Sequence, residues 1–556
     1  MPHHFVERTL QLFWDMDYKQ LAAFGGAVAV TYTVYWRYTR ISLDDVPGPD
    51  NPSFLHGHQP FLQDAEAGEL ENHYLTTYGS IVRWKGPLGE DRLWIADPKA
   101  IFRILHSVDL WVKTAAHREI HAVLLDRGLL WAEGDAHRRQ RKALTPAFGL
   151  SESRALMPRF FLVANKLVDK WKDVVMSEGS GGPHTLDIQL WMGKATLDAI
   201  GIGAFDYEFG ALDNLDNPLT KSYTDIVYST FGAPTNGQLL FMNLCRYLPA
   251  GVVRYMFETG SDPALQKARQ NRVHAHRVAR ELIDQKRQEM VVEQTEKDIL
   301  SLLVKANDTQ DEESKLRDDE IIAQVRTLML AGHETVAKTL MFGLWELAKQ
   351  PEIQRRLREE ITEAYEAART RGGDDLTPGD IDNLPFTNAV IKETLRRHAA
   401  AIEIQRVTWE DNVLPLTRPM VGRSGKTYHS LPVPKGTIVY ASCWGYNLNP
   451  DVWGPDAMAF RPERWLESSS EKTETPLGMY GNLLTFSAGG RSCIGWRFAV
   501  AEIQAFLVTL IREFSFSIPE GRNIRIARPG ILVPMVIGEE GKGLQLPLTI
   551  TPVRDL

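Results

Sequence analysis

The spacing of apolar positions along the chain predicts a mainly helical protein. Four long segments repeat apolar residues every three or four positions, the period of a helix with one buried face: Leu265–Val292, Asp319–Gln350, Ile353–Thr370 and Trp496–Phe514. Stretches with strand-like composition are short: Ser80–Trp84, Arg92–Ile95 and Thr437–Tyr440. Three polar stretches predict surface loops between helices: Ser177–Pro183, Asn307–Glu320 and Arg371–Asp380. The pattern therefore predicts a mainly α protein with a minor β-sheet region.

The first fifty residues differ from the rest. From Gln20 to Trp36 no residue is charged, and as a helix this segment spans ~25 Å, close to the ~30 Å hydrocarbon thickness of a bilayer. Lys19 and Arg37 flank it and can extend their charges to the membrane surface. We predict one transmembrane helix near residues 20–36, within an anchor of residues 1–45 that leads into a hinge at Pro47. The alternative is a buried amphipathic helix.

Charges beside this segment predict its orientation. Arg37 and Arg40 follow the apolar run while Asp15 and Asp17 precede it, which places the C-terminal bulk on the cytoplasmic side. Secretion is the weaker alternative, because Lys19 lies deep in the chain and no small-residue cleavage site follows the run.

Composition and charge exclude several classes of protein. The 556 residues include 63 Lys and Arg against 71 Asp and Glu, a net charge of −8, so overall charge does not favour nucleic acid as a partner. The three cysteines, Cys245, Cys443 and Cys493, are too few and too scattered for a disulfide framework, and none has zinc-like spacing. For Cys245 and Cys443 we expect a buried, small apolar side chain.

Cys493 lies in a different setting. Gly489 and Gly490 precede it and Gly495 follows, so the backbone can closely approach a flat object. An apolar helical face begins just afterwards, which places Cys493 at a helix N-terminus, where free N–H groups favour a thiolate.

The motif F-x-x-G-x-R-x-C-x-G, filled here by Phe486, Gly489, Arg491, Cys493 and Gly495, resembles the haem-thiolate loop of the cytochrome P-450 superfamily. The resemblance extends from Pro47 to the C-terminus and is to the microsomal, eukaryotic, fungal type. It implies the cytochrome P-450 fold in one catalytic domain, residues 46–556. It also implies haem b with Cys493 as the axial iron ligand, and dioxygen as co-substrate.

A second block resembles the oxygen-activating helix of the same family. Ala331 and Gly332 then open a groove for dioxygen, Thr335 hydrogen-bonds the bound oxygen, and Glu334 relays protons. The family usually has Thr or Ser after this threonine, whereas Val336 follows here, which removes one water partner. The structural alternative is a core helix that tolerates a glycine.

A third block resembles the family's buried Glu-Arg-Arg network. Glu393 and Arg396 share a helix face, and the resemblance implies that Arg464 bonds both Glu393 and backbone near the haem loop. Taken alone, Glu393 and Arg396 are equally consistent with a solvated surface pair. The predicted role is structural.

Haem propionates need cationic partners. His137 and Arg141 occupy the family's tryptophan and arginine positions on a propionate-binding helix, and a histidine makes that hydrogen bond pH-dependent. Arg406 and Arg491 are the remaining candidates.

The chain lacks a glycine-rich nucleotide loop and has only 63 residues after Cys493, so we expect its reductase to be a separate protein. The resemblance implies electrons from NADPH through a separate flavoprotein reductase, with cytochrome b5 as a second donor, at the endoplasmic reticulum membrane. The reductase would dock on the basic segment that contains Arg138, Arg139 and Lys142, for which solvated helix surface is the alternative.

The sequence thus predicts a membrane-anchored monooxygenase that hydroxylates or oxidises a lipophilic molecule, in secondary metabolism. The alternatives are a haem-thiolate isomerase, dehydratase or peroxygenase, and a non-catalytic haem carrier or sensor. The resemblance implies that pocket residues come from four segments: Trp111–Leu130, the helix face before Ala331, Ala399–Ile404 and Pro529–Met535. These segments are largely apolar, with Glu403 as a polar contact.

Overall fold

The computed structural model describes residues 41–177, 182–213, 228, 232, 234–292, 298–308, 315–373, 375–467 and 475–553. The helices are α3 (Gln59–Asp64), α4 (Glu69–Thr77), α5 (Pro98–His106), α6 (Ala115–Leu125), α7 (Gly134–Leu144), α8 (Leu150–Ala155), α9 (Met157–Ser177), α10 (Ile188–Ile200), α13 (Asn236–Leu244), α14 (Ala250–Thr259), α15 (Pro263–Val292), α16 (Ile299–Asp308), α17 (Asp318–Lys349), α18 (Pro351–Thr370), α19 (Pro378–Asp382), α20 (Pro385–Arg397), α21 (Cys443–Asn447), α22 (Pro450–Trp453) and α23 (Trp496–Glu513). The strands are β1 (Ile81–Lys85), β2 (Asp91–Ile95), β3 (Trp111–Val112), β4 (His184–Asp187), β5 (Glu403–Thr408), β6 (Asn412–Val421), β7 (Thr427–Val433), β8 (Ile438–Ser442), β9 (Phe514–Ser517), β10 (Ile524–Ala527), β11 (Val533–Val536) and β12 (Pro547–Pro552). The prediction of a mainly helical chain with a minor sheet region is confirmed.

The long helices begin where local chemistry favours a start. Pro351 and Pro385 occupy the first positions of α18 and α20, where a missing N–H costs nothing. Three acids, Asp318, Asp319 and Glu320, form the first turn of α17, next to the positive end of the helix dipole. The four predicted long helices correspond to α15, α17, α18 and α23, with boundaries within two residues.

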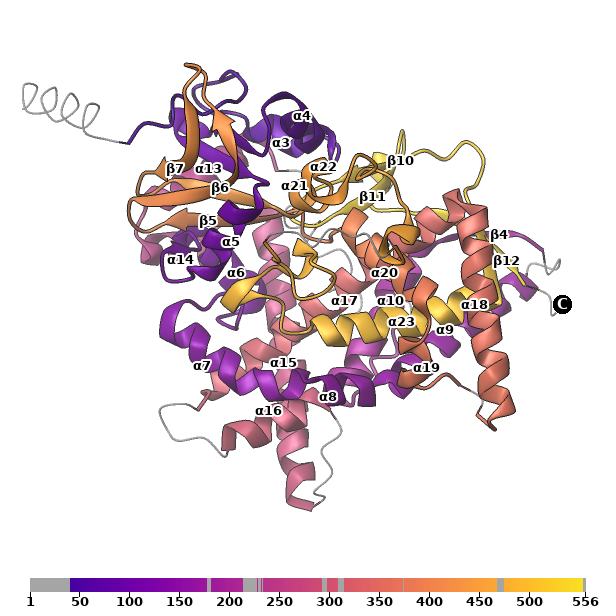
Figure 1. The fold of residues 1–556 in the computed structure, drawn as a ribbon. Coiled ribbons are helices and arrows are strands. Elements are labelled where there is room, and N and C mark those ends of the chain that lie inside the picture. The colour runs from indigo at the N-terminus through magenta and orange to yellow at the C-terminus, as the bar shows by residue number, and fades with distance from the viewer. Residues whose placement is uncertain are drawn as a thin grey trace, which may run out of the picture.

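The strands form small sheets at two ends of the molecule. The largest sheet has five strands in the order β1-β2-β8-β5-β3, in which only β2 and β8 pair in parallel. A three-stranded sheet, β4-β12-β9, lies at the opposite end, with helices between the two (Figure 1). Two hairpins, β6–β7 and β10–β11, complete the strands of the described residues.

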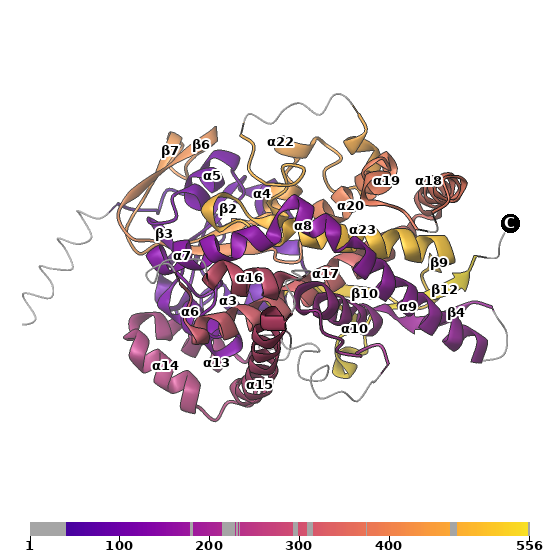
Figure 2. The same ribbon diagram turned by 90° about the horizontal axis from the view of Figure 1, so that it is seen from below.

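Helix α17 runs through the middle of the molecule. It contacts α10, α15, α20 and α23, and nearly all its side chains are buried. Figure 2 shows the same arrangement from below, with α9 and α23 side by side over the helical core. A rigid, central α17 can therefore position side chains against an internal site.

The predicted membrane helix at residues 20–36 lies outside the described residues, so it remains a prediction. Within the ranges that the structure does describe, no helix combines the length and the apolar character needed to cross a bilayer.

Candidate active site

Cys493 lies in a tight loop just before α23. Its backbone N–H donates to the Phe486 carbonyl at 2.8 Å, which closes the loop, and Gly495 is the N-cap of α23. The thiol is accessible to solvent, yet burial is the largest influence on its pKa. A thiol that is both accessible and enclosed by protein faces an internal space.

The N–H of Gly495, at the start of α23, lowers the pKa of the Cys493 thiol as expected, but it is not the dominant influence. Burial raises the pKa of the Cys493 thiol, and this outweighs the lowering by the Gly495 N–H and the Arg141 guanidinium. A bound cation such as haem iron supplies the missing charge, because coordination to a metal deprotonates a thiol.

Gly489 allows the loop to pack against α5. Its φ is +66°, and a Cβ atom there would lie 2.4 Å from the Leu105 carbonyl oxygen. No other residue satisfies both demands without strain. Gly489 thus gives the close backbone approach that the sequence predicts, but the contact visible in the structure is with α5.

Five basic side chains gather beside this loop: Lys113, His137, Arg141, Arg406 and Arg491. Burial, followed by repulsion from the other four groups, lowers the pKa of His137 to about 3. Burial also lowers the pKa of Lys113 to about 7 and that of Arg406 to about 10, with Arg491 adding repulsion in both cases. Among the described residues, Glu133 is the carboxylate that pairs with this group, through Arg491 and Lys113.

This cluster fits the two carboxylates of a haem. A buried excess of cations is costly unless anions neutralise it, and two propionates supply that charge. The cluster lies beside the accessible thiol of Cys493. Arg491 belongs to the cysteine loop, and Arg141 donates a hydrogen bond to Ser492 of that loop. The donor set therefore fits an iron porphyrin.

Arg141 and His137 differ in detail from their expected roles. Arg141 donates to the Ser492 carbonyl at 2.7 Å, so its guanidinium fixes the loop beside Cys493. Burial and the neighbouring cations lower the pKa of His137 to about 3, and the expected pH-dependent bond to a propionate remains a prediction.

One stripe of α17 is accessible while the flanking positions are buried. The stripe consists of Leu328, Ala331, Gly332 and Thr335, at helical spacing. The Thr335 hydroxyl donates to the Ala331 carbonyl at 2.7 Å. This face carries Ala331, Gly332 and Thr335, which the resemblance assigns to oxygen activation.

Gly332 has a packing role that the sequence did not indicate. A Cβ atom at this position would lie 2.5 Å from Cδ1 of Ile200, so glycine allows α10 to approach α17. The expected oxygen groove at Ala331 and Gly332 stays a prediction.

Glu334 faces a different side of α17 from Thr335. Successive helical residues point ~100° apart, and Glu334 lines a cavity of about 90 Å³ between α10 and α17. Lys338 and Gln189 line the same cavity, and the Lys338 ammonium donates to Gln189 Oε1 at 2.6 Å. A cavity of this size holds several waters.

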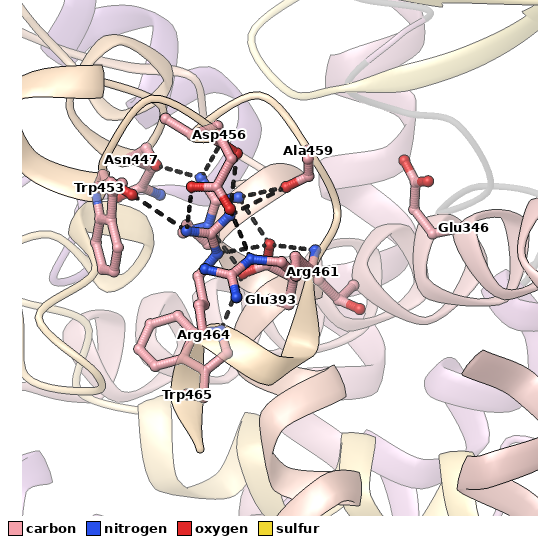
Figure 3. Close-up of polar contacts among 12 residues, drawn as sticks. Glu346, Glu393, Asn447, Trp453, Asp456, Ala459, Arg461, Arg464 and Trp465 are labelled. Atoms are coloured by element: carbon pink, nitrogen blue, oxygen red, sulfur yellow. Dashed lines mark hydrogen bonds and ion pairs between the residues drawn. The ribbon is translucent and has the colours of Figure 1, made fainter. Parts of the chain in front are cut away.

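Glu393 is the centre of a buried polar network (Figure 3). Arg396 donates to both its carboxylate oxygens at 2.9 and 2.8 Å, Arg464 adds a bond of 3.1 Å, and the Trp465 indole adds one of 2.9 Å. The backbone N–H of Arg461 completes the set at 2.8 Å. The carboxylate is fully hydrogen-bonded, which makes its burial tolerable.

The network reaches the haem loop by a route other than the predicted one. Arg464 bonds backbone carbonyls of Trp453 and Asp456, not of the haem loop. The connection runs through Asn447, whose carbonyl accepts from Arg396 and whose side chain bonds Thr485 and Leu484 beside the loop.

The expected pocket segments lie close together. The Leu532 N–H donates to the Ala400 carbonyl at 2.8 Å, and His117 Nδ1 lies 3.0 Å from Gln405 Oε1. The Leu129 N–H donates to Gln324 of α17 at 3.1 Å. These bonds bring parts of the expected segments close to one another, and the pocket itself remains a prediction.

Comparisons with known proteins agree with this site. The family model described as cytochrome P450 matches residues 47–537. The chain belongs to the cytochrome P-450 family. It is similar to the cytochrome P-450 monooxygenase claP of Ampulloclitocybe clavipes, at 34% identity over 91% of this chain and 92% of the relative. Cytochrome P-450 monooxygenase 205 of Postia placenta is 32% identical over 92% and 93%. A ganoderic acid synthetase of Ganoderma lucidum is 33% identical over 90% and 93%.

These findings confirm the predicted family and the predicted haem-thiolate monooxygenase class. Sequence reasoning missed Lys113, Glu133 and the Asn447 link. Lys113 and Asn447 lie outside the recognised motifs, and Glu133, which directly precedes the helix of His137, carried no signal of its pairing with Arg491.

Proposed function

We propose that this chain is a membrane-anchored, reductase-dependent cytochrome P-450 that hydroxylates or oxidises a lipophilic molecule of fungal secondary metabolism. The observation that carries the proposal is the accessible Cys493 thiol beside a buried cluster of cations with too few anions. The name of the Ganoderma lucidum relative, a ganoderic acid synthetase, supports a lipophilic substrate.

Bound haem supplies oxygen activation and C–H oxidation. Cys493 would hold the iron, while Arg406, Arg491 and His137 would hold the propionates. The Thr335 hydroxyl, on the accessible stripe of α17, donates to the Ala331 carbonyl, so its oxygen remains able to accept a hydrogen bond at the oxygen-activating site. Glu334 exchanges protons with water in the cavity between α10 and α17.

Electrons come from a separate NADPH-dependent flavoprotein, with cytochrome b5 as a second donor. The exposed side of α7 supports this, because Lys142 and Arg138 lie on it. Arg138 is partly neutralised by Asp109 and Asp135, and Arg139 is bound to Glu320, so Lys142 is the freest charge of this basic segment.

The catalytic domain lies on the cytoplasmic face of the endoplasmic reticulum membrane. A patch of exposed apolar side chains from two parts of the chain supports membrane contact, and it comprises Phe54, Leu55, Leu88, Tyr247 and Leu248, with Phe61 exposed on the neighbouring helix α3. Phe54 neighbours Gly89, and Glu90 accepts from the Tyr247 hydroxyl at 3.0 Å, so its parts adjoin. Such a patch marks an interaction surface.

Spectroscopy and turnover test the proposal together. The purified holoprotein should give a reduced carbon monoxide band near ~450 nm, which requires a thiolate ligand. With a flavoprotein reductase and a panel of lipophilic substrates, NADPH consumption should yield oxygenated product. An isomerase or peroxygenase would act without the reductase, and a haem carrier would give the band without turnover.

A further inference from the structure

Helix α10 packs against the turn of α17 that carries Glu334 and Thr335. Contacts between the two helices pair their residues in opposite chain order, so the helices run antiparallel. The pairs are Gln189 with Lys338, Thr196 with His333, and Ile200 with Gly332. The position of this turn of α17 therefore depends on α10.

Thr196 supplies the polar contact in the middle of this interface. Its side chain is fully buried, and its hydroxyl oxygen lies 3.0 Å from the His333 carbonyl of α17. The same oxygen lies 2.9 Å from the Met192 carbonyl, one turn earlier in α10. A hydroxyl has one proton to donate, so this proton is shared between carbonyls of two helices. Valine has the same shape as threonine, which makes the bridging hydroxyl the distinctive feature of this position.

The His333 carbonyl belongs to the peptide unit that leads into Glu334. Two neighbouring carbonyls also have side-chain partners: that of Met329 lies 2.8 Å from His333 Nδ1, and that of Ala331 accepts from the Thr335 hydroxyl at 2.7 Å. Additional bonds to helix carbonyls bend a helix locally. Of these three bonds, the one to His333 comes from another helix, so α10 helps to set the local shape of α17.

Glu334 and Thr335 have to point in two different directions from this one turn. Glu334 lines the cavity of about 90 Å³ between α10 and α17, whereas Thr335 lies on the accessible stripe. Because the two residues are adjacent in a helix, any rotation of the turn moves both side chains together. Groups that act on a reacting atom tolerate little displacement. A fixed His333 carbonyl opposes such a rotation.

We propose that Thr196 is a positioning residue for oxygen activation. Its hydroxyl holds the His333 carbonyl and thereby fixes the turn from which Glu334 and Thr335 project. Thr196 acts through the backbone of α17. This inference rests on the proposed function.

Hydrogen exchange in the full-length holoprotein tests the structural part of the inference. Thr196→Val keeps the shape of the side chain and removes the donor. The amides of residues 331–337 should then exchange ~5-fold faster, as the loss of one buried hydrogen bond allows. Residues 343–349, at the far end of the same helix, should exchange as before. Thr196→Ser keeps the hydroxyl and should restore slow exchange.

Turnover with the flavoprotein reductase tests the functional part. For a compound of the lipophilic panel that the unaltered protein oxidises, Thr196→Val should lower product per NADPH ~3-fold and raise hydrogen peroxide, with the ~450 nm band and the substrate affinity retained. Thr196→Ser should regain most of the product. Adding Thr196→Val to Thr335→Ala should lower the ratio no further than Thr335→Ala alone, because both changes affect the same step.

Thr394 of α20 is the matched control. It is buried, donates to the Val390 carbonyl of its own helix at 2.9 Å, and packs against α17, where a Cβ atom at Gly343 would lie 3.2 Å from its Cγ2. Its hydroxyl bonds no α17 carbonyl among the described residues. Thr394→Val should therefore leave both the exchange of residues 331–337 and the product ratio unchanged.

Several results would overturn the inference. They are unchanged exchange of residues 331–337 in Thr196→Val, an unchanged product ratio, and an additive loss in the double variant. Loss of the ~450 nm band in Thr196→Val would assign Thr196 to packing alone and overturn it as well. The proposed function fails separately, if the unaltered protein lacks the band or forms no product with the reductase, and the exchange comparison needs no turnover.

Discussion

At the scale of single residues, Thr335 allows a direct test of the proposed oxygen activation. Its hydroxyl lies on the accessible stripe of α17, and its bond to the Ala331 carbonyl leaves the oxygen able to accept. We expect Thr335→Ala to leave the ~450 nm band and substrate affinity nearly unchanged while product per NADPH falls ~10-fold, because protons then reach oxygen at the wrong position and hydrogen peroxide forms.

Thr339 offers a matched control one turn further along α17. Its hydroxyl makes the same type of bond, to the Thr335 carbonyl at 3.0 Å, but its side chain is buried. Thr339→Ala should therefore change stability by ~1 kcal/mol and leave coupling intact. An unchanged ratio of product to NADPH in Thr335→Ala would remove this residue from the mechanism.

Cys493 carries the second residue-scale prediction. Cys493→Ser should hold haem loosely and lose the ~450 nm band, because only a thiolate donates enough electron density. Cys443→Ser is the control, since that thiol is buried in the core and bonds the Leu484 carbonyl at 3.5 Å. A band retained in Cys493→Ser would mean that another residue ligates iron.

At the scale of elements, one ion pair joins α7, which carries His137, to the start of α17. Arg139 bonds both oxygens of Glu320 at 2.7 and 2.8 Å. Although burial acts in the opposite direction, Arg139, the Arg317 N–H and Gln140 together lower the pKa of Glu320 to about 2. The carboxylate therefore contributes to the folded state only while it is ionised.

This pair predicts a particular acid sensitivity. The folded pKa of about 2 lies below the ordinary value of 4.5, so the stabilisation is complete above about pH 4.5 and is lost as pH falls towards 2. Glu320→Gln should lower the free energy of unfolding by ~1–3 kcal/mol at pH 7 and flatten its dependence below pH 4.5. Urea unfolding between pH 3 and 7 measures both effects.

Asp319→Asn is the control for that experiment. Asp319 lies in the same helical turn but is exposed and pairs only with Arg317, so its removal should change little. Equal effects of the two substitutions would contradict a specific role for the Arg139–Glu320 pair.

Periodicity and motifs made the elements predictable, whereas long-range contacts were not. The helix carrying Thr335 and the loop carrying Cys493 follow from local spacing, and both lie where predicted. The role of Gly332 depends on Ile200, and the route from Arg396 to the loop depends on Asn447. Such long-range pairings are set by tertiary packing. The residues next to Gly332 or Asn447 in the sequence do not indicate them.

The net charge of the whole molecule and the local charge of its interior have opposite signs. The chain carries a net charge of −8, yet a buried group around His137 and Arg491 holds an excess of positive charge. The sum over the sequence therefore hides the feature that identifies the cofactor, because propionate recognition depends on where the cations gather and not on how many there are.

Membrane attachment is the last whole-molecule prediction, and it involves two parts of the chain. The apolar segment of residues 20–36 is expected to span the bilayer, while the exposed patch around Phe54 and Tyr247 adds a second, peripheral contact. Deleting residues 1–40 should convert tightly held protein into protein that carbonate or mild detergent releases, with the ~450 nm band intact.

Adding Phe54→Ser and Phe61→Ser to the deletion should then abolish the remaining binding to phospholipid vesicles, since each removes a large exposed apolar side chain. Phe102→Ser, at another exposed phenylalanine on α5, is the control and should leave vesicle binding unchanged. Loss of the haem spectrum on deletion would instead mean that residues 20–36 belong to the folded core, and full vesicle binding by the triple change would exclude the patch as a membrane contact.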